Sequence, residues 1–202
     1  MNRGLWIVLG SVLTIASSWL GLVVLPYLQL RQLDAIENTA GIAYPQPLGE
    51  LATEGRKVYI ANGCIYCHSQ QVRGEGYGVD IQRNWGTRRT VPRDYIYESP
   101  VLLGTMRTGP DLSNVGLRWS ADWQHKHLYN PRMMSPGSIM PSFSFLYEAR
   151  PIGETPSPDA LILSGSWAPE PGQEIVPTQQ AKALVEYLLS LNRSVDLPEA
   201  HE

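Results

Sequence analysis

Cysteine, phenylalanine and charged residues are scarce in this chain of 202 residues. It has two cysteines and two phenylalanines, and charged residues make up 17% of the chain, below the roughly 25% typical of soluble proteins. The cysteines, Cys64 and Cys67, lie in one short stretch, which excludes a disulfide framework. The formal net charge of -3 leaves no basic footprint for nucleic acid. We therefore expect one ordinary domain and no nucleic-acid partner.

The deficit of charge is concentrated near the N-terminus. Residues 5–30 contain no charged side chain, and the run exceeds the ~20 residues that cross a bilayer as a helix. A cleaved signal peptide is the rival interpretation, because Arg3 precedes the run and small residues lie within it. The apolar run is longer than the roughly 7–15 residues of such signals. We predict a transmembrane anchor over residues 1–31, with its helix ended or kinked at Pro26.

The rest of the chain divides by composition. Residues 32–49 are rich in glycine and proline and are predicted to link the anchor to a domain over residues 50–193. Within that domain, residues 144–176 carry five prolines and few apolar runs, which predicts a long, loop-rich surface insertion. Residues 194–202 form a polar tail, in which we expect His201 to be disordered.

Several stretches of the domain carry sequence signals for helices, which predicts a mainly α fold. Thr53 and Ser120 are predicted N-caps of helices over residues 54–61 and 121–128, and Thr178 is predicted to begin the last helix. That last helix carries an apolar stripe of helical period, formed by Ala181, Leu184, Val185, Leu188 and Leu191.

The stripe must be buried against another element. We expect the last helix to cross the one that contains Gly55, because the missing side chain lets two backbones approach closely. Tyr59 and Tyr187 would flank this crossing.

Residues 64–68 carry the clearest chemical motif. Cys64, Cys67 and His68 form the C-x-x-C-H pattern that attaches a c-type haem, with two thiols for the vinyl groups and an adjoining imidazole for the iron. A thioredoxin-like redox pair would need a βαβ context, which the flanking sequence lacks. A zinc site would need further ligands, for which His125 and His127 are the only loose candidates. We interpret both histidines as surface residues.

A low-spin electron carrier needs a second axial ligand, and a thioether sulfur raises its reduction potential relative to a second histidine. The candidates are Met106, Met133, Met134 and Met140. Met140 precedes a proline in a Pro- and Gly-containing stretch, a rigid non-helical loop that can hold a side chain at a fixed height. This favours Met140, while packing is the alternative role of the others.

Two further residues are predicted to support the haem. A ligating histidine usually donates its second ring N–H to a carbonyl or carboxylate, and the Pro110 carbonyl is the expected acceptor for His68. An ordinary Gly-Pro turn is the alternative. Arg107 has the geometry to bind a haem propionate, with a solvated arginine as the equal alternative.

The flanking sequence extends these motifs. The stretches GRKVYIANGCIYCHSQQVR, RTGPDLSNVGLRWSADW, HLYNPR, PGSIMPSF and ALVEYLLSLN, together with the anchor, cover most of the chain. In these stretches the chain resembles the mono-haem cytochrome c subunit (subunit II, FixO/CcoO type) of cbb3-type cytochrome oxidases.

The resemblance implies a class I cytochrome c fold with one covalent haem c, held by Cys64 and Cys67 and ligated by His68 and Met140. It implies electron transfer to a haem-copper catalytic subunit that reduces oxygen, with a second cytochrome c subunit as a further partner and no catalytic site in this chain. Because the family's haem is attached outside the cytoplasmic membrane, the domain is expected on the periplasmic side of the bacterial inner membrane. Arg3 would then be cytoplasmic.

Three other functions remain open from the sequence. The small cytochrome subunit of a nitric oxide reductase also has one anchor and one haem c, and residues 74–77 resemble it, although the RTGPDL and PGSIMPSF stretches favour the oxidase. A free-standing membrane-anchored electron carrier would form no stable complex. A thiol-disulfide enzyme would keep Cys64 and Cys67 as free thiols.

Overall fold

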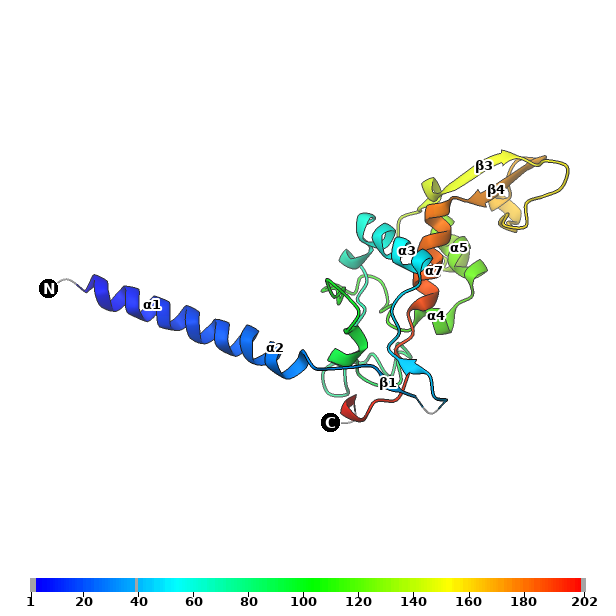
Figure 1. The fold of residues 1–202 in the computed structure, drawn as a ribbon. Coiled ribbons are helices and arrows are strands. Elements are labelled where there is room, and N and C mark those ends of the chain that lie inside the picture. The colour runs from blue at the N-terminus through cyan, green and yellow to red at the C-terminus, as the bar shows by residue number, and fades with distance from the viewer. Residues whose placement is uncertain (1–2, 39, 201–202) are drawn as a thin grey trace.

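The computed structural model describes residues 3–38 and 40–200, and it consists of a long N-terminal helix that extends from a mainly helical domain (Figure 1). The helices and strands are α1 Gly4–Trp19, a π-helical turn Leu20–Val24, α2 Leu25–Leu30, β1 Ile36–Glu37, β2 Ala43–Tyr44, α3 Glu50–Ala61, α4 Val115–Arg118, α5 Ala121–Tyr129, α6 Pro131–Met134, β3 Tyr147–Pro151, β4 Gln173–Pro177 and α7 Gln179–Ser190. Short 3₁₀ turns lie at Cys64–Tyr66, Pro92–Tyr95, Ser144–Leu146, Gly165–Trp167 and Pro198–Ala200.

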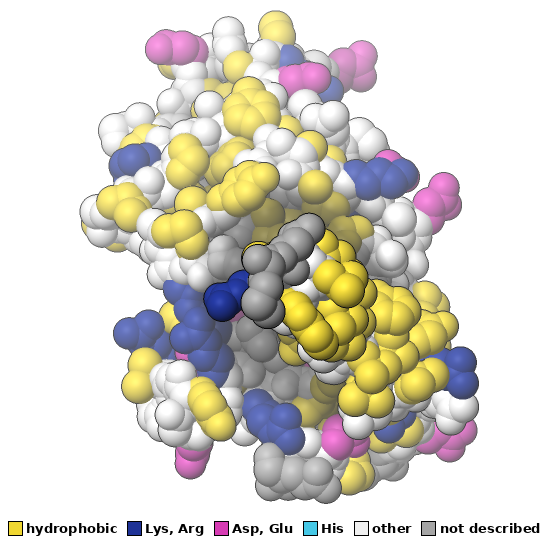
Figure 2. All heavy atoms as spheres, turned by 90° about the vertical axis from the view of Figure 1, so that its left-hand side faces the viewer, with side chains coloured by type: hydrophobic (Ala, Val, Ile, Leu, Met, Phe, Trp, Pro, Cys, Tyr) yellow, Lys and Arg dark blue, Asp and Glu magenta, His cyan; other side chains and the backbone are white. Residues whose placement is uncertain are grey.

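The N-terminal helix is long and apolar enough to cross a membrane. It runs without a break through Gly4–Leu30, has a mean hydropathy of 2.1, and buries none of its most apolar stretch against the domain. Hydrophobic side chains surround it in the view from its N-terminal side (Figure 2). Pro26 does not end this helix, contrary to one of the two outcomes expected for it. Pro26 has no backbone N–H to donate. The preceding π turn, in which the Leu25 N–H donates to the Leu20 carbonyl, accommodates it within the helix.

The crossing of α3 and α7 organises the domain, as predicted. A Cβ atom placed on Gly55 would lie 1.8 Å from the Ala183 carbonyl oxygen, so only glycine allows the two backbones this close. The rings of Tyr59 and Tyr187 meet edge to face beside the crossing, with their centroids 5.4 Å apart.

Two of the three predicted helix starts are confirmed. The Ser120 hydroxyl accepts from the Trp123 N–H and the Thr178 hydroxyl from the Ala181 N–H, each at 3.3 Å. The third prediction was wrong: α3 begins at Glu50 with Gly49 as its N-cap, and the Thr53 hydroxyl donates to the Gly49 carbonyl within the helix. The acidic Glu50 in the first turn is itself favourable, because it lies at the positive end of the helix dipole.

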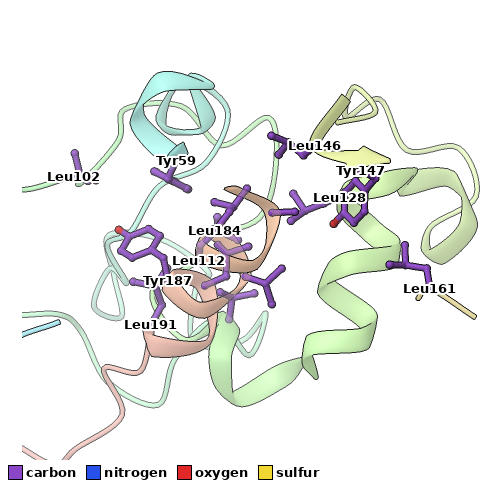
Figure 3. Close-up of a cluster of buried hydrophobic side chains, with 14 of the residues drawn as sticks. Tyr59, Leu102, Leu112, Leu128, Leu146, Tyr147, Leu161, Leu184, Tyr187 and Leu191 are labelled. Atoms are coloured by element: carbon purple, nitrogen blue, oxygen red, sulfur yellow. The ribbon is translucent and has the colours of Figure 1, made fainter. Parts of the chain in front are cut away.

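The apolar stripe of α7 lies at the centre of the hydrophobic core. All five predicted residues are buried, and Figure 3 shows Leu184 and Leu191 of this group together with Leu112, Leu128 and Tyr187. Side chains from α3, α5 and the segment before α4 therefore share one core with the last helix.

The insertion at 144–176 is more ordered than predicted. Strands β3 and β4 pair antiparallel, with Tyr147 opposite Pro177 and Pro151 opposite Gln173, and the ribbon lies beyond the N-terminal end of α7 (Figure 1). Leu146, Tyr147, Leu161 and Ile175 join the main core, so this loop-rich segment contributes a strand pair and core residues as well as surface loops. Its apolar residues are scattered between prolines, and the strand pairing that gathers them has no short-range signal.

The predicted linker and tail pack against each other. Tyr44, Val91, Leu197 and Ala200 form a second buried cluster, in which Leu197 is 0% exposed. The Tyr44 hydroxyl donates to the buried Asp94 carboxylate at 2.5 Å. The tail therefore packs against the domain as far as Ala200, and His201, for which disorder was expected, lies outside the described residues.

Candidate functional site

A cavity of about 710 Å³ lies between the haem motif, the core helices and the loop after α6. Its volume is in the range usual for small-molecule and cofactor sites. The lining is mainly apolar and aromatic and comprises Tyr59, Cys64, Cys67, His68, Trp85, Thr108, Gly109, Pro110, Leu112, Val115, Arg118, Trp119, Trp123, Gln124, His127, Leu128, residues 135–141, Leu184 and Leu188. Four of the predicted haem residues, Cys64, Cys67, His68 and Met140, share this cavity.

The two thiols and the imidazole reach the cavity from a single turn. Gly63 adopts a left-handed conformation (φ 68°) at the end of α3, and the chain then forms the 3₁₀ turn Cys64–Tyr66. The N–H groups of Cys67 and His68 both donate to the Cys64 carbonyl, at 3.1 and 3.0 Å. Both cysteines are free, and burial raises the pKa of the Cys64 thiol to about 11. This local geometry presents both thiols and the ring to one ligand.

The His68 ring is oriented by the contact that the sequence predicted. Its Nδ1 lies 2.7 Å from the Pro110 carbonyl oxygen, and since a carbonyl can only accept, Nδ1 carries the proton. Burial lowers the pKa of His68, against the opposing effects of this hydrogen bond and of the Asp111 charge. The imidazole is therefore neutral near pH 7, with the Nε2 lone pair available for a metal.

Two glycines that the sequence reasoning missed hold His68 in place. A Cβ on Gly109 would lie 2.2 Å from the His68 Cε1, and one on Gly104 would lie 2.4 Å from the His68 carbonyl oxygen. Gly109 also donates its N–H to the Cys67 carbonyl at 2.8 Å. Gly109 directly precedes Pro110, which the sequence had already indicated as the partner of His68. This position was the one sequence signal for the role of Gly109.

Met140 is the one of the four candidate sulfur ligands that lines the cavity; Met106, Met133 and Met134 do not. It is partly buried, and its N–H donates to the Ser138 hydroxyl at 3.3 Å. The end of the loop is fixed by the Phe143 N–H, which donates to the Leu128 carbonyl at 2.9 Å. Met106 is 55% exposed.

The family model described as cytochrome c oxidase, mono-heme subunit/FixO matches residues 3–159. This chain belongs to the FixO family. No curated protein matched it in a direct comparison. The FixO match runs from the membrane helix past Met140 and stops before β4 and α7, although α7 supplies the centre of the core. Membership makes this chain a mono-haem subunit of cytochrome c oxidase, an oxidoreductase complex.

Arg107 of this FixO-family chain lies elsewhere than predicted. It does not line the cavity, and it is not a solvated surface residue either. Its Nε donates to the Ser69 hydroxyl at 3.0 Å, its Nη2 to the Gln71 carbonyl at 2.5 Å, and its Nη1 to the Asp80 carboxylate. The guanidinium thus binds Ser69, Gln71 and Asp80, in the segment after the haem motif, and does not line the cavity.

Arg118, Gln124 and His127 form a polar part of the cavity wall, where Arg107 had been expected. Arg118 lines the cavity and donates through Nη2 to the Asp111 carbonyl at 2.9 Å. Its Nε, the Gln124 Nε2 and the His127 Nδ1 are buried and have no hydrogen-bond partner among residues 3–38 and 40–200. All three residues line the cavity, so this part of the wall offers polar side chains that suit a ligand with acceptor groups. Haem, with an apolar macrocycle and two carboxylates, fits these walls.

The histidines on α5 were predicted to be surface residues, and both are partly buried. His127 stacks on Trp123, which stacks on Trp119, with centroid distances of 4.5 and 4.3 Å. Burial lowers the pKa of His127 to about 4. His125 instead faces Tyr147, with its Nδ1 3.1 Å from the hydroxyl oxygen. The aromatic stack therefore forms part of the cavity wall.

Proposed function

We propose that this FixO-family chain is a membrane-anchored cytochrome with a class I cytochrome c fold, which passes electrons to the haem-copper catalytic subunit of a cbb3-type oxidase. The observation that carries this proposal is the single cavity in which Cys64, Cys67, His68 and Met140 meet. When bound, haem c supplies a one-electron iron couple, and the protein supplies its attachment, ligation and surroundings.

Each of these side chains has a distinct task. Cys64 and Cys67 would hold the haem through thioether bonds to its two vinyl groups, and His68 would provide Nε2 as an iron ligand. The Pro110 carbonyl holds the imidazole in the tautomer that ligation needs. Met140 would supply a sulfur ligand, which raises the potential relative to a second histidine.

Arg118 is the residue we assign to a haem propionate, in place of Arg107. Arg118 lines the cavity, whose walls are otherwise mainly apolar and aromatic. A guanidinium suits a carboxylate because several N–H groups lie in one plane. Gln124 and His127 provide further donors on the same wall.

The apolar helix through Gly4–Leu30 anchors this domain in the bacterial cytoplasmic membrane. We place the haem domain on the periplasmic side, because c-type haem is attached there in the family, and Arg3 on the cytoplasmic side. The partners are then the catalytic subunit, a second cytochrome c subunit and the lipid bilayer.

The test is expression of the full chain with a c-type maturation system. Haem staining on a denaturing gel is expected to label the wild-type protein, and Cys64→Ser with Cys67→Ser is expected to abolish the label. A wild-type protein without covalent haem would reject the proposal, and would instead favour the thiol-disulfide alternative.

Purification of the native complex separates the remaining alternatives. Co-purification with haem b, copper and oxygen uptake is expected for a cbb3 oxidase. Nitric oxide consumption without oxygen uptake would indicate the reductase, which the oxidase description of the matching family disfavours. A chain that leaves the membrane alone under gentle solubilisation would be a free-standing carrier.

A further inference from the structure

A buried cluster of charges lies beside the proximal histidine. The side chains of Asp111 and Asp80 are 0% and 2% exposed, and Arg107 between them is 15% exposed. Arg107 forms an ion pair with Asp80 and places its Nη2 4.0 Å from Asp111 Oδ2. Charges so far removed from water interact strongly with their surroundings, since solvent screens them poorly.

Asp111 and Arg107 of this cluster both bind the segment that follows His68. Asp111 Oδ2 accepts from the Ser69 hydroxyl at 2.6 Å and from the Gln71 N–H at 2.8 Å, and its Oδ1 accepts from the Ser113 N–H at 2.8 Å. Arg107 donates to the same Ser69 hydroxyl and to the Gln71 carbonyl. The residue after His68 and the residue after Pro110 are therefore joined directly.

Asp111 also lies close to the His68 ring in space. It follows Pro110, whose carbonyl accepts from the His68 Nδ1 at 2.7 Å, and its carboxylate binds Ser69, the residue after His68. A fixed negative charge at this place stabilises a positive charge nearby, and a fixed positive charge does the reverse. Oxidation of an iron bound at Nε2 of the same ring would add one positive charge there.

We propose that Arg107 and Asp111 are positioning residues that set the reduction potential of the haem by opposing charge. Asp111 favours the oxidised state and lowers the potential, while Arg107 offsets it and raises the potential. The inference rests on the proposed function, because it requires a haem ligated by His68.

The test is a redox titration of the haem absorbance in the detergent-solubilised full-length protein. Arg107→Gln is expected to shift the midpoint potential downward and Asp111→Asn to shift it upward. Arg107→Lys, which keeps the charge, is expected to stay closer to wild type than Arg107→Gln. Combining Arg107→Gln with Asp111→Asn is expected to give a potential between those of the single variants.

Asp122→Asn is the matched control. Its carboxylate also pairs with a cation, Lys126, but its side chain is 63% exposed, so solvent screens the charge. Its potential is expected to equal that of the wild-type protein.

Potential shifts of the same sign for Arg107→Gln and Asp111→Asn would overturn the inference, because a purely structural role of the two residues does not predict shifts of opposite sign. Should Asp111→Asn fail to acquire haem, the Arg107→Lys and Arg107→Gln pair decides: equal shifts overturn the inference, and a shift restored by lysine supports it. A wild-type chain without covalent haem would reject the proposed function itself, which haem staining distinguishes.

Discussion

The two sides of the cavity are built differently. On the His68 side, residues 67–71 are bound to the segment 103–112: the Gly109, Leu112 and Gln70 N–H groups donate to the carbonyls of Cys67, Ser69 and Leu103, each at 2.8 Å. On the Met140 side, residues 135–137 and 139 are exposed, with Ile139 76% exposed. The hydrogen bonds within residues 135–140 are local, and the loop is bound to α5 at its end, where the Ser142 hydroxyl and the Phe143 N–H donate to the carbonyls of Tyr129 and Leu128.

This difference assigns different tasks to the two sides: the His68 side would hold the haem, and the Met140 side would adjust its ligation. The side that carries both thiols and the imidazole is rigid, because its backbone and its buried carboxylates are satisfied by distant segments. The methionine side has few buried contacts, and such segments open at the smallest free-energy cost. We therefore expect changes on the His68 side to affect haem retention and changes on the Met140 side to affect ligation.

Replacing the ligands tests this comparison with the largest effect. His68→Ala is expected to abolish haem incorporation, whereas Met140→Leu is expected to keep the covalent haem and lower its midpoint potential, because a sulfur ligand is lost. Haem staining and redox titration measure the two effects. Met133→Leu and Met134→Leu are the controls, and a drop in potential equal to that of Met140→Leu in either would refute the ligand assignment.

Gly109→Ala is expected to damage the rigid side. The added methyl group would overlap the His68 ring, and overpacking of this kind costs about 1–3 kcal/mol. Urea titration followed by haem absorbance measures the loss. Gly153→Ala is the matched control, because nothing lies within 4 Å of its Cβ position. Equal stability of the two variants would show that the His68 ring tolerates movement.

Arg118→Gln is expected to lower the midpoint potential without removing the haem. The change deletes a positive charge beside the proposed propionate, which leaves the oxidised haem relatively more stable. Redox titration measures the shift, with the exposed Arg132→Gln as control. An unchanged potential in Arg118→Gln would place the propionates elsewhere.

Ser138→Ala is expected to have the smallest effect. It removes the hydroxyl that accepts from the Met140 N–H, a bond worth about 1 kcal/mol or less at a partly exposed site. The sulfur-to-iron absorption band should persist, with a small loss of stability against urea. Loss of that band would mean that the methionine loop is as tightly built as the histidine side.

Features that depend on neighbours in the chain were predictable. The charge-free run, the C-x-x-C-H turn, the caps at Ser120 and Thr178 and the stripe of α7 each arise within a few residues. Even the crossing at Gly55 followed from the sequence, because an apolar stripe needs a partner and a glycine offers the closest approach.

Features that depend on distant segments were not predictable. Arg107 and Arg118 are both plausible partners for a propionate, and only packing turns the first toward Asp80 and the second into the cavity wall. The β3–β4 ribbon and the packed tail also join residues that no short pattern relates.

The sequence by itself determined the long apolar N-terminal helix, the C-x-x-C-H turn and the family, and it favoured Met140 among the methionines, because helix length, thiol spacing and residue order are local properties. The tertiary structure decided which arginine lines the cavity and which charges lie buried beside His68. Those choices depend on burial and contact between segments tens of residues apart, where packing and desolvation outweigh local preference.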